Sequence, residues 1–66
     1  MHIQLNGETY AVSESLSVAG LIEHLQLAGR RVAVELNFEI VPRSMYEATL
    51  LKEGDAVEIV HAIGGG

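Results

Sequence analysis

The dipeptide Asn6-Gly7 is the feature that most limits what this chain can fold into. It separates two short runs rich in β-forming residues, one containing Ile3 and Leu5 and the other covering residues 9–12. A two-residue hairpin turn needs positive φ at both central positions, a conformation that asparagine and glycine tolerate best. The sequence therefore predicts that the chain begins with an antiparallel β-hairpin.

One amphipathic helix is expected after this hairpin. The apolar residues that recur at helical spacing are Val18, Leu21, Ile22 and Leu25. Ser17 stands before them as the expected N-cap, and Gly29 follows as the expected C′ glycine that ends the helix. Gly20 lies inside the helix, where glycine costs about 1 kcal/mol relative to alanine. Its presence predicts close packing against the sheet.

Three further strands follow the helix. Alternating residues predict a third strand over residues 32–36, and a tight turn at Asn37-Phe38 leads into a short fourth strand over residues 39–41. Pro42 ends that strand, because proline lacks the N–H group that a sheet needs. The last strand is expected over residues 56–62, with Val57 and Ile59 facing inward. The chain therefore contains enough strands for one small mixed sheet.

Two connections separate the fourth strand from the last. Residues 44–47 have the spacing of a capping box and predict one helical turn, and Gly54 is expected at the positive-φ position of the turn over residues 52–55. The complete order predicts an α+β protein with a β-grasp fold, a mixed sheet of four to five strands packed on one main helix. We expect residues 1–62 to form the β-grasp domain and residues 63–66 to form a flexible glycine-rich tail.

Composition excludes several kinds of site and partner. The 66 residues include no cysteine, which excludes disulfides, thiolate metal sites and a cysteine nucleophile. The net charge of −5 argues against nucleic acid as a partner and favours docking on a basic patch of another protein. No signal-peptide pattern and no apolar run of membrane-spanning length is present. We therefore expect a cytoplasmic protein with no membrane association.

Side chains that could perform catalysis are dispersed along the sequence. His2, His24 and His61 do not form a recognisable metal-binding pattern. No serine is placed recognisably with a histidine and an acid. The strand glutamates that are expected to point outward are Glu35, Glu39 and Glu58. The prediction is a protein that is not an enzyme, with no catalytic residue, no metal and no bound cofactor.

The run Gly64-Gly65-Gly66 carries the clearest functional signal. Glycine has no side chain to bury and loses more backbone freedom on ordering than any other residue. A glycine strand can, however, enter a channel that excludes Cβ atoms and place a terminal carboxylate in the active site of another protein. Because an ionised carboxylate is a poor electrophile, a partner must activate it, typically as an acyl-adenylate. The alternative is a frayed terminus without function.

Four segments match the pattern of a known family: Ala-Val-Glu-Leu-Asn at residues 33–37, Ile-Val-Pro-Arg at 40–43, Glu-Gly-Asp at 53–55 and the closing residues 59–66. On these segments the chain resembles the ubiquitin-like sulfur carriers, and most closely those of thiamine biosynthesis. The likeness covers the whole chain in length and element order, and the closing Gly-Gly is its strongest part. Phe38 departs from the small or polar residue usual in its turn.

The resemblance implies a mechanism that depends on partner proteins. A ubiquitin-activating-like adenylyltransferase uses ATP and magnesium to adenylate the carboxylate of Gly66, and a sulfur donor protein converts the adenylate to a thiocarboxylate. Thiazole synthase then uses this sulfur to build the thiazole ring of thiamine. Gly64 and Gly65 keep the approach to the active site narrow. The residues expected to dock a partner, on the exposed sheet face near the tail, are Leu36, Phe38, Val60, Ala62 and Ile63.

Three other functions remain open at this point. The small subunit of molybdopterin synthase shares the fold, the Gly-Gly end and the thiocarboxylate, although its helical insertion is usually larger than residues 43–50 allow. A ubiquitin-like modifier forms isopeptide bonds with lysines from the same adenylate, and Lys52 is the only lysine here. A plain β-grasp interaction module has an inert tail.

Overall fold

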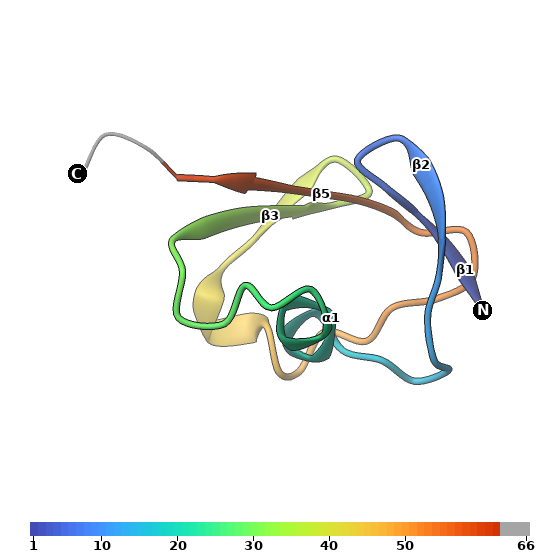
Figure 1. Cartoon of the computed structure of the whole chain (residues 1–66), viewed down its shortest axis with the longest axis horizontal. Helices are drawn as coiled ribbons and strands as arrows, with labels where there is room; N and C mark the ends of the chain where they lie inside the picture. Colours follow the sequence, from blue (N-terminus) through green and yellow to red (C-terminus); the bar gives the residue numbers. More distant parts are fainter. Residues whose placement is uncertain (63–66) are drawn as a thin grey trace.

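The computed structural model describes residues 1–62, and the predicted tail at residues 63–66 lies outside the described part. Five strands form one sheet in the spatial order β2-β1-β5-β3-β4, with one helix packed on one side (Figure 1). Strands β1 and β5 pair in parallel, and the other neighbours are antiparallel. In chain order the elements are β1 His2–Leu5, β2 Glu8–Ala11, α1 Val18–His24, β3 Val32–Leu36, β4 Glu39–Val41, the 3₁₀ helix η1 Arg43–Met45 and β5 Ala56–His61. This is the predicted β-grasp arrangement.

Both hairpins turn through two residues in the left-handed region. Asn6 and Gly7 have φ values of 50° and 85° in the β1–β2 turn, and Asn37 and Phe38 have φ values of 52° and 71° in the β3–β4 turn. Both predicted turns are therefore confirmed. Glycine or asparagine is usual at such positions, because a Cβ atom is disfavoured at positive φ. Phe38 is thus held in a conformation that a bulky side chain rarely adopts.

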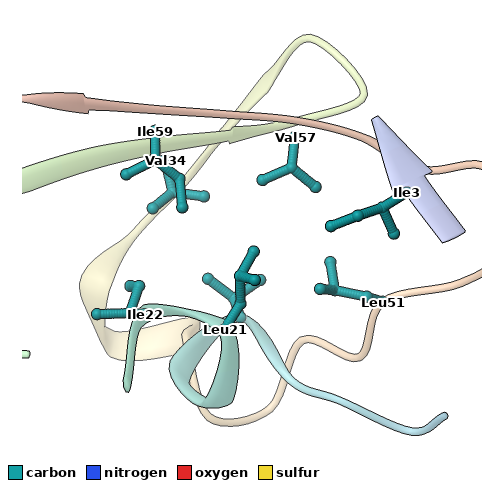
Figure 2. Close-up of a cluster of buried hydrophobic side chains, with 8 residues drawn as sticks. Ile3, Leu21, Ile22, Val34, Leu51, Val57 and Ile59 are labelled. Carbon is teal, nitrogen blue, oxygen red and sulfur yellow. The ribbon is translucent and has the colours of Figure 1, made fainter. Parts of the chain in front are cut away.

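Apolar side chains fill the space between the sheet and α1. The buried ones are Ile3, Val18, Leu21, Ile22, Val34, Leu51, Val57 and Ile59 (Figure 2). They come from three neighbouring strands, from the helix and from the segment that precedes β5. Because the chain has no cysteine, burial of this apolar area is the main source of stability.

Helix α1 begins as predicted. The hydroxyl of Ser17 accepts a hydrogen bond from the Gly20 N–H at 3.0 Å, which makes Ser17 the N-cap. A Cβ atom on Gly20 would lie 2.7 Å from Cδ1 of Leu16. The glycine therefore allows the segment before the helix to pack closely on its first turn. The prediction that Gly20 packs against the sheet is wrong, because its close neighbour is Leu16.

Helix α1 ends earlier than predicted. Gln26 has a φ of 62°, and its N–H bonds the carbonyl of Glu23 at 2.9 Å. The next N–H, of Leu27, bonds the carbonyl of Ile22 at 2.9 Å. These two bonds form a Schellman motif in which Gln26 occupies the C′ position. The prediction that Gly29 ends the helix is wrong, and Gly29 lies in the following loop with a φ of 80°.

Two turns lie between β4 and β5, the 3₁₀ helix η1 and the turn at Gly54, and only the second has the predicted form. The 3₁₀ helix η1 begins at Arg43, directly after Pro42, and no side chain caps it. The capping box expected over residues 44–47 does not form, because the helical turn starts one residue earlier and lasts three residues. Gly54 has the predicted positive φ, 84°.

Candidate functional site

The face of the sheet that points away from α1 is open. Strand neighbours alternate between the two faces, so Val57 and Ile59 on β5 point to the core while Glu58 and Val60 point away from it. Residues directly opposite each other on paired strands lie on the same face of the sheet. The β3–β5 pairing therefore assigns the β3 residues to a face, and the β3–β4 pairing does the same for the β4 residues. The residues that we call the outer face are Ala33, Glu35, Ile40, Ala56, Glu58 and Val60.

Large apolar side chains on and beside the outer face are exposed to solvent. Val60 is 55% exposed and Ile40 is 67% exposed, and Phe38 in the adjoining turn is 85% exposed. Apolar side chains gathered on one face mark a surface that another molecule can cover. Val60 is exposed on the outer face, as the sequence predicted. Phe38 is exposed too, but its turn lies beside Ala56 at the start of β5, so the prediction that it lies near the tail is wrong. Ile40 was missed, although its alternation with the half-buried Val41 was a signal that it points outward.

Two residues predicted to point outward lie on the core side. Leu36 is opposite Val57, is half-buried and packs against the core. It cannot contribute to the outer face, so its assignment to the docking surface is wrong. Glu39 lies opposite Leu36 and therefore shares the core side, exposed on the edge strand β4. Glu35 and Glu58 point outward as predicted.

The described part of the chain ends at Ala62, one residue after β5. The N–H of Ala62 donates to the carbonyl of Arg31 at 3.0 Å, which ties this end to the residue before β3. Ala62 is exposed and follows the alternation that places Val60 on the outer face. The predicted docking residue Ile63 and the predicted tail, Gly64, Gly65 and Gly66, lie outside the described residues. Figure 1 shows β5 running along the sheet to this end.

Two asparagine side chains hold β5 in place. Asn6 Oδ1 accepts from the N–H of Ile59 at 2.9 Å, and Asn6 Nδ2 donates to the Ile59 carbonyl at 3.2 Å. Asn37 Oδ1 accepts from the N–H of Ala56 at 2.9 Å, and Asn37 Nδ2 donates to Oδ1 of Asp55 at 3.1 Å. Each hairpin turn therefore binds the strand that leads to the C-terminal residues.

Side chains with catalytic potential do not gather within residues 1–62. The carbonyl of His2 accepts a hydrogen bond from the N–H of Gly54, two residues before β5 begins, whereas His61 is the last residue of β5. These two histidines therefore lie near opposite ends of that strand. The His24 ring packs edge-on against Tyr10, with 6.1 Å between the ring centroids. In this part of the chain no three His, Cys, Asp or Glu residues are arranged to hold a metal ion. No helix there is long and apolar enough to span a bilayer.

Comparison with known proteins gives consistent matches over the chain. The model of the ThiS family matches residues 3–66. The sulfur carrier protein ThiS of Bacillus subtilis is 35% identical over 65 residues, which cover 97% of this chain and 98% of that protein. The crystal structure of the thiamine biosynthesis protein ThiS from Geobacter metallireducens superposes with a TM-score of 0.88 at 42% identity, over 100% of both chains.

A similar segment also occurs inside a much longer protein. The thiazole synthase of Paramagnetospirillum magneticum is 46% identical over 66 residues, which cover 100% of this chain. The chain spans only 20% of the length of that protein. The β-grasp unit described here therefore corresponds to one part of a larger polypeptide in that relative.

Proposed function

The chain belongs to the ThiS family, and from this premise we propose that it is a sulfur carrier of thiamine biosynthesis and not an enzyme. The observation that carries the proposal is the family match over residues 3–66. The near full-length similarity to a protein named sulfur carrier protein ThiS supports it. The proposed reactive group is the carboxylate of Gly66.

In the proposed mechanism, activation takes place in the active site of a partner adenylyltransferase. The Gly66 carboxylate attacks the α-phosphate of ATP, and magnesium-bound pyrophosphate leaves. A sulfur donor protein then supplies sulfur at the oxidation level of sulfide, which attacks the acyl carbon. The C–S bond forms and the C–O bond to AMP breaks, leaving a thiocarboxylate. A cytoplasmic location is part of this proposal, since the activation consumes ATP.

The proposed acceptor of the sulfur is thiazole synthase. Its support is the similar segment that lies within a protein of that name in Paramagnetospirillum magneticum. The segment and that protein's remaining chain share one polypeptide, which keeps them at high effective concentration. A carrier that is not fused to its acceptor would instead have to recognise it through its surface.

The folded domain supports this role through strand β5. The side chain of Asn37 binds the first residue of β5, Ala56, and the side chain of Asn6 binds Ile59, so the strand that precedes Gly64-Gly65-Gly66 has a fixed position in the sheet. Ordering a glycine residue in a partner's channel costs about 1–2 kcal/mol of backbone entropy. The affinity for a partner must therefore come from the folded surface, for which the outer face with Val60 and Phe38 is the proposed site.

The test is intact-protein mass spectrometry after incubation with ATP, the adenylyltransferase of the same organism and a sulfide source. We expect a mass gain equal to one oxygen replaced by sulfur. A variant lacking Gly66 is the matched control and should gain nothing. If the adenylyltransferase is active on another carrier but leaves this chain unchanged, the proposal fails. A product linked to lysine amines would favour a protein modifier instead.

A further inference from the structure

A hollow of about 300 Å³ lies between the tips of the two hairpins, on the outer face. Figure 1 shows these two tips, the β1–β2 turn and the β3–β4 turn, on the same side of the molecule. The residues that line it are Gln4, Gly7, Glu35, Phe38, Ala56, Val57 and Glu58. Within residues 1–62, no lysine, arginine or histidine lines it.

The two glutamates of this hollow face each other across neighbouring strands. Glu35 on β3 is directly opposite Glu58 on β5, and both side chains are on the outer face. Side chains in such a pair have Cβ atoms about 4.5–5.5 Å apart, and like charges at this spacing destabilise a sheet. Among residues 1–62, no hydrogen bond ends on either carboxylate. The isolated domain therefore carries an uncompensated pair of negative charges here.

Phe38 adds a second unfavourable feature at the same place. Its φ of 71° is a conformation that favours glycine, and its ring is 85% exposed. Backbone strain of this kind persists where surrounding structure enforces it, and it clusters at binding sites. The same hollow is thus lined by an exposed phenylalanine in a strained conformation and by two glutamates that face each other. Neither feature stabilises the domain by itself, but both suit a partner that covers them.

We propose that this hollow binds an arginine side chain of a partner protein, the adenylyltransferase or thiazole synthase of the proposed function. A guanidinium group is planar and presents several N–H donors, so it can bond the carboxylates of Glu35 and Glu58 together. Its face can also stack on the ring of Phe38. The aliphatic stem of the arginine covers the methyl group of Ala56, which lies on the outer face. The inference rests on the proposed function only for the choice of these two partners.

The experiment measures thermal stability and partner affinity on the same variants. The double variant Glu35→Gln/Glu58→Gln removes the two opposed charges, and Phe38→Gly removes the ring and the strained conformation. The control, Glu14→Gln/Glu47→Gln, changes the net charge equally at two exposed residues that do not line the hollow. Binding of the purified adenylyltransferase and thiazole synthase of the same organism is measured by isothermal titration calorimetry.

We expect both hollow variants to unfold at a temperature a few degrees higher than the natural chain, because each removes an unfavourable feature. We expect each of them to bind one of the two enzymes at least tenfold more weakly, since a hydrogen-bonded charge pair or a stacked ring is lost from the interface. The control should bind within twofold of the natural chain. Higher stability together with weaker binding is the signature of a docking site.

Unchanged binding by the two hollow variants would overturn the inference, as would an equal loss of binding in the control. If the natural chain binds neither enzyme, the inference also fails. Thiocarboxylate formation is followed separately on the natural chain in each case. The proposed function stands when the thiocarboxylate forms, even if the hollow proves irrelevant, so the two failures can be told apart.

Discussion

The side-chain amide of Asn6 bonds both main-chain groups of Ile59. Its Oδ1 atom accepts the Ile59 N–H at 2.9 Å, and its Nδ2 atom donates to the Ile59 carbonyl at 3.2 Å. Strand β1 has already ended at Leu5, whose partner in the parallel pairing is Val57. The amide of Asn6 thus continues the β1–β5 ladder with a side chain in place of a strand residue.

Removing this amide should weaken the whole domain. Asn6→Gly keeps the positive φ of the turn and loses both hydrogen bonds to Ile59, so we expect the free energy of unfolding to fall by about 1–3 kcal/mol. Asn6→Asp keeps the acceptor atom and should lose less. Urea denaturation followed by circular dichroism measures both. A glycine variant as stable as the natural chain would show that the amide contributes nothing.

Glycine at position 26 should stabilise the protein. Gln26 occupies the C′ position of α1 with a φ of 62°, where glycine has no steric penalty. We expect Gln26→Gly to raise the free energy of unfolding by about 0.5–1 kcal/mol. The control is Ala28→Gly, at an exposed neighbouring residue without positive φ, which should not stabilise. A loss of stability in Gln26→Gly would contradict the Schellman assignment.

Two leucines with opposite burial test the position of the core. Leu21 has no solvent-exposed surface, and it lies among the core side chains in Figure 2. Leu21→Ala should cost about 2–5 kcal/mol, a large share of the stability of so small a domain. Leu50 is 56% exposed, and Leu50→Ala should change the free energy of unfolding by less than about 1 kcal/mol. Equal losses in thermal or urea unfolding would contradict the assigned core.

Val60 should matter for partner recognition more than for folding. Val60 is 55% exposed on the outer face. Leu50 is 56% exposed, but it pairs with Ser17, the N-cap residue of α1, and is not part of the outer face. Loss of about 1 kcal/mol of apolar contact corresponds to about fivefold in affinity. We therefore expect Val60→Ser to lower kcat/KM of the adenylyltransferase about fivefold, mainly through KM. Leu50→Ser should leave it unchanged, and equal effects of both variants would argue against the outer face as the docking surface.

The fold could be predicted because its decisive signals are local. Asn6-Gly7 fixes the first hairpin through backbone sterics alone, and Ser17 marks the helix start through one hydrogen bond within the first turn. The helix end could not be read in the same way. Gln26 adopts positive φ because the bonds of the Schellman motif hold it there, while the glycine that signals a helix end stands three residues later.

The site was harder to predict because it depends on pairing between distant strands. The opposition of Glu35 and Glu58 follows from the β3–β5 register. Alternation within each strand indicates which face its side chains occupy, but it does not say which residue of the other strand lies opposite. Leu36 was a different kind of error. It alternates with Val34, so period two already placed it with the core residues and against the docking surface.

The most direct test of the central claim follows sulfur from this chain to its acceptor. The chain is first loaded with heavy-isotope sulfide by the adenylyltransferase and ATP, purified, and mixed with thiazole synthase and its other substrates in a single turnover. We expect the heavy isotope to appear in the thiazole product while the mass of the chain returns to that of the carboxylate at Gly66. Retention of the isotope on the chain, with thiazole synthase active on another carrier, would contradict the sulfur-carrier account.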